Sequence, residues 1–334
     1  MYQLKQLPED FIVKEISSVQ LKDKGSYLYF LMKKKNRNTL DVVKEIAKQL
    51  NLKEKQVGFA GSKDKQAVTE QVCSVKNISK EKLSGLRIDN VELKFLGYND
   101  QPICLGDLAG NQFEITVRNL DSIKIKIIDF VENYFDEQRF SRNNAEIGRY
   151  LVKKKFKEAV KLIDAPKVQQ QLQKNPNDSI GALKLLPLRL LKLYVNAYQS
   201  YLWNETLAEY LKNKTGAKEV KYSLGSLFFI KKKIKNFDLP LIGFDELKTK
   251  AQIKKIINKI MQKEGLTHQD FIIKPIPELS LEGEERKAFV KIKDLEIKPA
   301  EPDELNKNKP KIKVKFTLPK GSYATMVIRK LFLD

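Results

Sequence analysis

The chain has 334 residues, of which 63 are Lys or Arg and 42 are Asp or Glu, so its formal net charge is +21. A chain of this length corresponds to about two domains, and its 42% of hydrophobic residues argues against wholesale disorder. The large positive charge favours a polyanionic partner such as a nucleic acid. A lysine-rich proteome would produce the same balance without such a partner, so charge alone leaves both explanations open.

Cysteine and histidine are scarce in this sequence. The chain contains two cysteines, Cys73 and Cys104, and one histidine, His268. They are far apart and lack the close spacing of zinc ligands, so we expect neither a metal site nor a disulfide framework. A histidine base would have to be His268, which we expect to be a surface residue. An enzyme of this composition would therefore act through carboxylates and cations.

Targeting and membrane signals are not visible. The N-terminus runs at once into Pro8-Glu9-Asp10, which does not resemble a signal peptide. The most apolar region, 180–195, is interrupted by charged residues and a proline, so it does not predict a membrane span. We expect a cytoplasmic protein that has no membrane partner.

The N-terminal part of the chain has mainly strand patterns. An aromatic-rich run at 27–32 predicts a strand, and Thr39 is a plausible N-cap for the following helix, whose apolar face includes Val42 and Ile46. Further on, helical spacing is expected over 125–135. The other predicted strands cover residues 57–60, 68–75, 91–96 and 113–117.

The texture changes between about residues 144 and 287. Apolar residues there recur at intervals of three and four, as in Ile253, Ile256, Ile257 and Ile260, which predicts helices. Strand texture returns around 312–316. The pattern indicates an α+β protein whose mixed, largely antiparallel sheet is built from both chain ends, with a mainly helical block inserted between them.

Several segments, in this order, resemble one family. They are KQLPEDFIVKE at 5–15, GFAGSKDKQAVTEQ at 58–71, GNQF at 110–113, NYFDEQRF at 133–140, NAYQSYLWN at 196–204 and LPKGSYAT at 318–325. Together they resemble the TruD family of tRNA pseudouridine synthases, and the element G-x-K-D-x-x-A-x-T-x-Q is the most specific of them. The resemblance extends over nearly the whole chain.

This resemblance implies a domain organisation and an activity. Residues 1–144 and 288–334 would form a pseudouridine synthase catalytic domain, and residues 145–287 an inserted, mainly helical α/β TRUD domain. The enzyme would isomerise uridine to pseudouridine in tRNA, typically uridine 13 of the D-arm, without cofactor or metal. The tRNA partner would present a flipped uridine, and its phosphates would lie on a lysine-rich surface.

The most specific motif contains the candidate nucleophile. Asp64 matches the catalytic aspartate of the family, and the flanking Lys63 and Lys65 favour its ionised form. Gly61 is expected to permit a tight turn and a close approach of the backbone to a nucleotide. Lys5 matches a basic position of the opening motif. It is expected to pair with Asp64 or a phosphate, unless it is one surface lysine among many.

Three further residues match family positions around the target nucleotide. Phe11 and Tyr323 offer aromatic faces that can stack on a flipped base, and Asn133 can both donate to and accept from a base or ribose edge. Phe135 and Phe140 have the same potential, although aromatic residues near helix ends more often belong to the core.

Two other functions remain open at the sequence level. A catalytically inactive basic RNA-binding protein would share the charge, but the intact Asp64 motif argues against it. A metal-dependent nuclease would need clustered acidic ligands, which we do not find in the predicted strands. Lysine clusters at 33–35, 153–155 and 231–233 fit phosphate contacts without base specificity. The oligomeric state stays open, with a monomer favoured.

Overall fold

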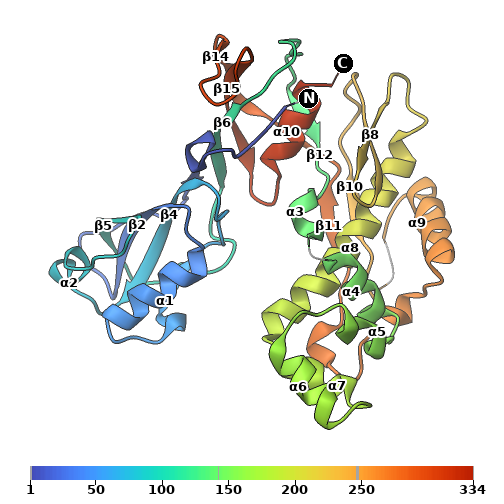
Figure 1. The fold of residues 1–334 in the computed structure, drawn as a ribbon, viewed down its shortest axis with the longest axis horizontal. Coiled ribbons are helices and arrows are strands. Elements are labelled where there is room, and N and C mark those ends of the chain that lie inside the picture. The colour runs from blue at the N-terminus through green and yellow to red at the C-terminus, as the bar shows by residue number, and fades with distance from the viewer. Residues whose placement is uncertain (1, 142, 246–247, 334) are drawn as a thin grey trace. The chain divides into compact units, whose positions relative to one another are not determined.

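The computed structural model describes residues 2–141, 143–245 and 248–333, and the chain divides into two compact units. Unit 1 consists mainly of Met1–Asp129 and Lys291–Ala324, and unit 2 of Phe130–Val290 and Thr325–Leu333. Figure 1 shows the elements of each unit. The boundaries between the catalytic domain and the TRUD domain, at 144/145 and 287/288, remain a prediction.

A nine-stranded mixed sheet organises unit 1, with the strand order β13-β15-β6-β1-β4-β2-β5, while β14 pairs with β15 and β3 with β4. Strands β1 and β4 are parallel, and the other pairs in this sheet are antiparallel. The sheet thus combines strands from both chain ends, which confirms the predicted α+β class. The strands are β1 (Phe11–Ile16), β2 (Tyr27–Lys35), β3 (Val57–Phe59), β4 (Val68–Lys76), β5 (Val91–Asn99), β6 (Gly110–Val117), β13 (Lys293–Ile297), β14 (Glu301–Pro302) and β15 (Pro310–Pro319).

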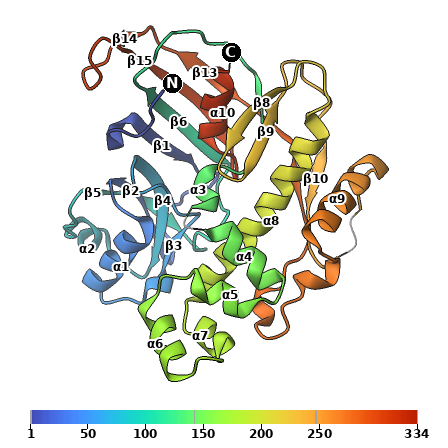
Figure 2. The same cartoon turned by 45° about the vertical axis from the view of Figure 1, so that its right-hand side comes forward.

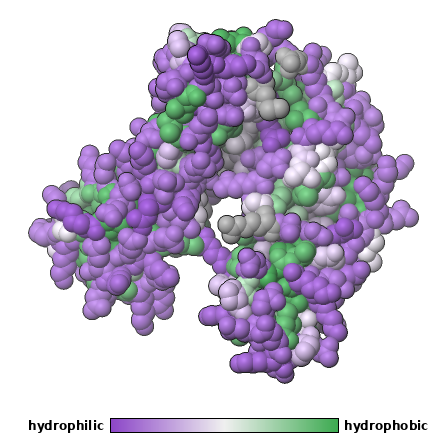
Figure 3. All heavy atoms as spheres, in the orientation of Figure 1, coloured by the Kyte–Doolittle hydropathy of each residue, from purple (hydrophilic) through white to green (hydrophobic). Residues whose placement is uncertain are grey.

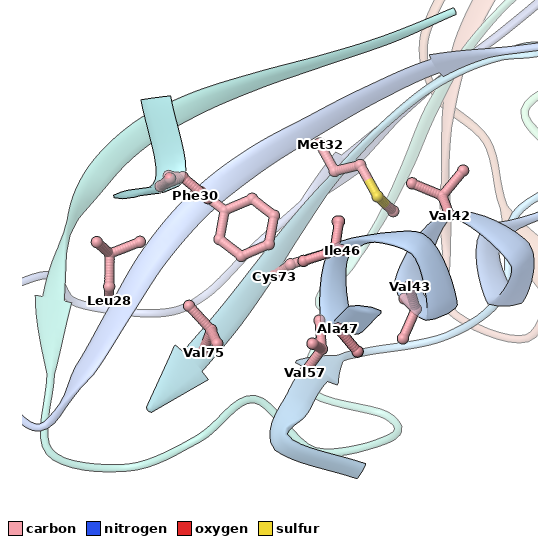
Figure 4. Close-up of a cluster of buried hydrophobic side chains, with 11 residues drawn as sticks. Leu28, Phe30, Met32, Val42, Val43, Ile46, Ala47, Val57, Cys73 and Val75 are labelled. Atoms are coloured by element: carbon pink, nitrogen blue, oxygen red, sulfur yellow. The ribbon is translucent and has the colours of Figure 1, made fainter. Parts of the chain in front are cut away.

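Helix α1 (Thr39–Gln49) covers one face of this sheet, and the short α2 (Lys80–Ser84) contributes Leu83 to the same core. Figure 4 shows Phe30 and Met32 of β2 directed towards Ile46 and Val42 of α1. Alternate residues of a strand point to the same face, so Leu28, Phe30 and Met32 of β2 enter this core, whereas Tyr29 joins a second cluster. Its burial is the main hydrophobic contribution to the stability of this part of unit 1.

Two predictions about local structure are wrong. Residues 121–129 are not helical, and β7 (Phe130–Glu132) pairs with β12 (Phe289–Lys291). Isoleucine and lysine alternate just before β7, a strand-like pattern, and pairing with β12 overrides the helical spacing. The N-cap of α1 is Asn38, whose Oδ1 accepts from Leu40 N, and Thr39 is the first helical residue.

Unit 2 is built around the long helix α8 (Leu188–Leu211), which packs against α4 (Asn144–Val152) (Figure 2). At Gly148 a Cβ would lie 2.0 Å from Tyr194 O, so the close approach of these helices requires glycine. Helices dominate 144–287 as predicted, and the positions of the four strands there were not predicted. The remaining elements are α3 (Glu137–Phe140), α5 (Phe156–Lys161), α6 (Pro166–Lys174), α7 (Ser179–Lys184), β8 (Lys218–Tyr222), β9 (Gly225–Phe229), β10 (Asp238–Leu241), α9 (Ala251–Glu264), β11 (Glu284–Lys287) and α10 (Ala324–Leu331).

Hydrophilic residues cover most of the face drawn in Figure 3, and hydrophobic residues appear there in separate patches. Among the described helices, none is long and apolar enough to cross a membrane. Cys73 is buried and Cys104 exposed, and both are free thiols.

Candidate active site

Asp64 lies in the loop that joins β3 to β4 in unit 1. Its Oδ2 accepts a hydrogen bond from Lys5 Nζ at 2.9 Å, and the Lys5 and Asp64 side chains remain 21% and 24% exposed. The structure therefore brings together two candidate residues that are 59 positions apart in the sequence. An ammonium at this distance attracts the carboxylate as an ion pair, and the partial exposure leaves the pair accessible.

Lys5 is held in place by its neighbours. It has a left-handed backbone conformation with φ at 58°, and its carbonyl accepts from Gln66 Nε2 at 2.6 Å. Its Nζ lies 4.1 Å from the centre of the Phe11 ring, a cation–π contact. Phe11 itself is only 3% exposed and packs edge-on against Phe113. In unit 1, Phe11 therefore supports the ammonium group that binds Asp64.

The loop is pinned on the N-terminal side of Asp64. Lys63 N donates to Thr39 Oγ1 at 3.0 Å, and the Lys63 ammonium forms a buried ion pair with Glu15. Thr39, the first residue of α1, thus uses its hydroxyl to fix this loop. Upstream, the carbonyl of Gly61 accepts from a glutamine amide of β4 at 3.1 Å. Main-chain bonds such as these restrict the motion of the Asp64 backbone.

The expected tight turn at Gly61 is wrong. Its φ lies outside the left-handed region, and a Cβ placed there would meet nothing within 4 Å. The fold of unit 1 does not itself require glycine at this position. The space beside the backbone remains compatible with the expected close approach of a nucleotide.

A buried lysine also contacts the loop and was missed at the sequence level. Lys34 Nζ donates to Asp64 O at 2.8 Å and to Arg37 O at 2.7 Å, and Lys34 is 1% exposed. Burial lowers the pKa of Lys34 from 10.5 to about 8, although the charge of Asp64 opposes this shift. Lys33 and Lys35 are ion-paired near the surface with Glu92 and Glu9. The 33–35 cluster is therefore not a continuous basic surface.

Asn133 lies in unit 2 and is 6% exposed. Its Nδ2 donates to Lys287 O at 3.0 Å, and its Oδ1 accepts from Arg286 Nη2 at 2.8 Å. The Arg286 guanidinium also lies 4.1 Å from the centre of the Phe135 ring. Arg286, Phe135 and Arg139 line a pocket of about 610 Å³. Asn133 therefore orients an arginine beside a pocket, and its predicted contact with the nucleotide remains a prediction.

The other candidate residues are half-buried or buried. Tyr323 is half-buried in the turn between β15 and α10, and its role at the nucleotide stays a prediction. Phe135 and Phe140 are both buried in unit 2. His268 is half-buried, with Nδ1 2.8 Å from Gly243 O, and is not the exposed residue expected. Among the described residues, no group of three or more His, Cys, Asp or Glu could hold a metal ion.

Comparison with known proteins decides the family. A family model described as tRNA pseudouridine synthase D matches residues 2–170, 165–223 and 225–331. The chain belongs to the tRNA pseudouridine synthase D family. This confirms the predicted family and enzyme class: the protein is a tRNA pseudouridine synthase, an isomerase. A metal-dependent nuclease is set aside.

Relatives of this tRNA pseudouridine synthase match over nearly their whole length. The tRNA pseudouridine synthase D of Aquifex aeolicus is 34% identical, with 98% of this chain and 97% of that protein covered. The probable tRNA pseudouridine synthase D of Nanoarchaeum equitans is also 34% identical, with 99% and 98% covered. A crystal structure of the putative tRNA pseudouridine synthase D from Methanosarcina mazei has a TM-score of 0.69 at 26% identity, covering 99% of this chain and 93% of that one. The similarity therefore includes both units.

Proposed function

We propose that this enzyme converts uridine 13 in the D-arm of tRNA into pseudouridine, with Asp64 as the nucleophile and without a cofactor. The supporting observation is the part-exposed pair of Lys5 Nζ and Asp64 Oδ2, 2.9 Å apart, within the motif that matches the catalytic aspartate of the family. The catalytic domain is proposed to comprise residues 1–144 and 288–334, and the TRUD domain residues 145–287.

The reaction requires a nucleophile that is charged and held still. The C1′–N1 bond breaks, the uracil rotates, and a C1′–C5 bond forms, while C5 loses one proton and N1 gains one. A carboxylate can start this sequence by attacking either C6 of the ring or C1′ of the ribose. Lys5 binds the Asp64 oxygen before attack and stays beside it as the negative charge moves into the uracil.

The target uridine must leave its base stack before Asp64 can reach it. We propose that Tyr323 stacks on the flipped nucleotide, and that Phe11, whose ring is covered by the Lys5 ammonium, acts on the nucleotide through Lys5. We further propose that Asn133 acts on the nucleotide through Arg286, which its amide oxygen orients. The net charge of +21 supports binding of the tRNA phosphates. Phosphate contacts orient the tRNA, whereas the nucleotide pocket selects the base.

The decisive experiment maps pseudouridine in unmodified tRNA after incubation with wild type and Asp64→Asn, in the presence of a metal chelator. We expect wild type to modify uridine 13 and Asp64→Asn to be slower by about 10⁴-fold or more, because the nucleophile is lost. Asp23→Asn is the matched control, since Asp23 is an exposed aspartate of the same unit. An active Asp64→Asn variant would exclude the nucleophile assignment, and modification elsewhere in the tRNA would exclude only the target position.

A second variant tests the charge partner. Lys5→Met removes the ammonium group that binds the Asp64 carboxylate, so we expect turnover to fall, measured across the pH–rate profile. Lys5→Arg keeps the positive charge and should preserve most of the profile. An unchanged profile with normal turnover for Lys5→Met would show that Lys5 has no part in the reaction.

A further inference from the structure

Lys34 occupies a position in β2 that normally contains an apolar residue. Leu28, Phe30 and Met32 enter the hydrophobic core of unit 1, and Lys34 is the next residue in the same alternation (Figure 4 shows the first three). Its side chain is buried, with 1% of the residue exposed. An ammonium group in such a place loses its hydration, which costs free energy unless other groups bind it.

The Lys34 ammonium connects two loops. Arg37 belongs to the turn between β2 and α1, and Asp64 to the loop after β3. Lys34 Nζ donates to the carbonyl oxygens of both residues, at 2.7 and 2.8 Å. The loop is also fixed one residue earlier, where Lys63 N binds Thr39 Oγ1. The bond from Lys34 acts on residue 64 itself.

We propose that Lys34 is a positioning residue for the isomerisation, because it fixes the main chain of Asp64 while Lys5 binds the carboxylate at the exposed end. This inference rests on the proposed role of Asp64 as the nucleophile. The two lysines act on different parts of the same residue, since Lys34 holds the backbone from within the core and Lys5 holds the reacting oxygen. A loop held in this way keeps the carboxylate in one orientation for attack.

The surrounding charges support this assignment. The Lys63 ammonium is already neutralised by the buried Glu15, whereas the Lys34 ammonium binds neutral carbonyl groups. Its positive charge therefore remains behind Asp64 and adds to that of Lys5. An apolar side chain of similar size would be easier to bury at this position, so the lysine is explained by its contact with the Asp64 loop rather than by stability.

The test is Lys34→Met, with Lys33→Met and Lys35→Met as matched controls in the same strand. Both control residues are paired near the surface, so the substitution there leaves the Asp64 loop intact. We expect Lys34→Met to lower kcat by about 100-fold, the scale expected for a displacement of about 1 Å at a reacting group. KM for tRNA should stay near wild type, the melting temperature should not fall, and the control variants should keep kcat.

A conservative variant distinguishes a role in positioning Asp64 from a role in stability alone. Lys34→Arg retains the cation and its donors and should recover part of kcat, whereas Lys34→Gln, a shorter neutral donor, should recover less. Wild-type kcat in Lys34→Met would overturn the inference, as would a parallel loss of kcat, tRNA binding and melting temperature. If Lys34→Met does not fold, Lys34→Gln decides by the same criteria. An inactive Asp64→Asn with a fully active Lys34→Met would refute only the role of Lys34.

Discussion

The Asp64 loop of unit 1 and the Asn133 segment of unit 2 both come from sequence motifs of the family, yet their side chains are held differently. The Asp64 carboxylate is 24% exposed and binds Lys5, while its backbone is fixed by Lys34. Asn133 is 6% exposed, and both its amide nitrogen and its amide oxygen are bonded, to Lys287 and Arg286.

This difference separates two kinds of functional residue. At Asp64 the main chain is immobilised and the side chain is left accessible to a reactant, which suits a nucleophile. At Asn133 the side chain itself is part of the local hydrogen-bond network, which suits a residue that orients a neighbour such as Arg286. A motif therefore predicts that a residue matters, while its bonding indicates how it acts.

The segment that contains Lys5 is held by a buried arginine, Arg118. Arg118 is 4% exposed, and it binds Asp10 Oδ1 through Nε and Asp303 Oδ1 through Nη1, both at 2.8 Å. Its main chain also pairs with that of Gln3. These contacts hold both ends of the segment that contains Lys5, so the arginine anchors that segment.

We expect the largest effect on stability from Arg118→Met. It leaves two buried carboxylates without their cation, which costs about 3–5 kcal/mol of unfolding free energy. Urea unfolding at neutral pH measures this loss. Glu304→Gln is the control, because Glu304 binds the same guanidinium but is 54% exposed and should contribute little. A loss below about 1 kcal/mol in Arg118→Met would mean that the cluster does not hold the Lys5 segment.

Asn133→Ala should have the next largest effect. It removes the amide contacts to Lys287 and Arg286, and we expect a loss of about 1–3 kcal/mol together with weaker tRNA turnover. Asp64→Asn should leave stability nearly unchanged while abolishing turnover. Thermal unfolding and pseudouridine formation, measured on both variants, test the contrast. Equal stability losses in the two variants would remove the distinction between the two regions.

Much of the fold could be predicted because strands and helices leave a periodic signal. The alternation in β6 and the three-and-four spacing in α9 identified these elements. The predicted helix at 125–135 was wrong because strand β12, more than 150 residues later, pairs with Phe130–Glu132. Short local patterns do not contain such long-range pairing.

The site could be predicted only where a motif marked it. Asp64 and Lys5 came from family segments, and the structure places their side chains in contact. Lys34 was not singled out because it lies in a run of three lysines. Its spacing of two residues from Met32 and four from Phe30 could have predicted that it faces the core. Arg118 had no such signal, since its partners Asp10 and Asp303 are 108 and 185 residues away.

Gly61→Ala tests whether the open space beside the Asp64 loop serves the substrate. A Cβ there meets no atom of the protein within 4 Å, so stability should be unchanged or rise by about 0.4–1 kcal/mol. Turnover should fall if a nucleotide packs against this backbone. Gly148→Ala is the contrasting control, because its Cβ would collide with Tyr194 O and destabilise unit 2. Unchanged kcat and KM in Gly61→Ala would show that the substrate does not use this space.

A pH dependence is predicted for the buried side of the Asp64 loop. Burial lowers the pKa of Lys34 from 10.5 to about 8, against the opposing charge of Asp64 and with a smaller contribution from Lys63. Below about pH 8 the folded protein therefore contains a buried charge. Between about pH 8 and 10.5 the folded form loses this proton while the unfolded form keeps it, so the contribution of Lys34 to stability rises with pH.

We therefore expect wild type to gain stability relative to Lys34→Met as the pH is raised from 7 to 10, measured by urea unfolding at each pH. The difference between the two proteins isolates Lys34, because the other titrating groups are common to both. Lys33→Met should show no such trend, since Lys33 is partly exposed and paired with Glu92. A constant difference between wild type and Lys34→Met would mean that the ammonium is hydrated. Lys34 would then be hydrated like Lys5, and the contrast between a buried cation at the Asp64 main chain and an exposed cation at its carboxylate would be lost.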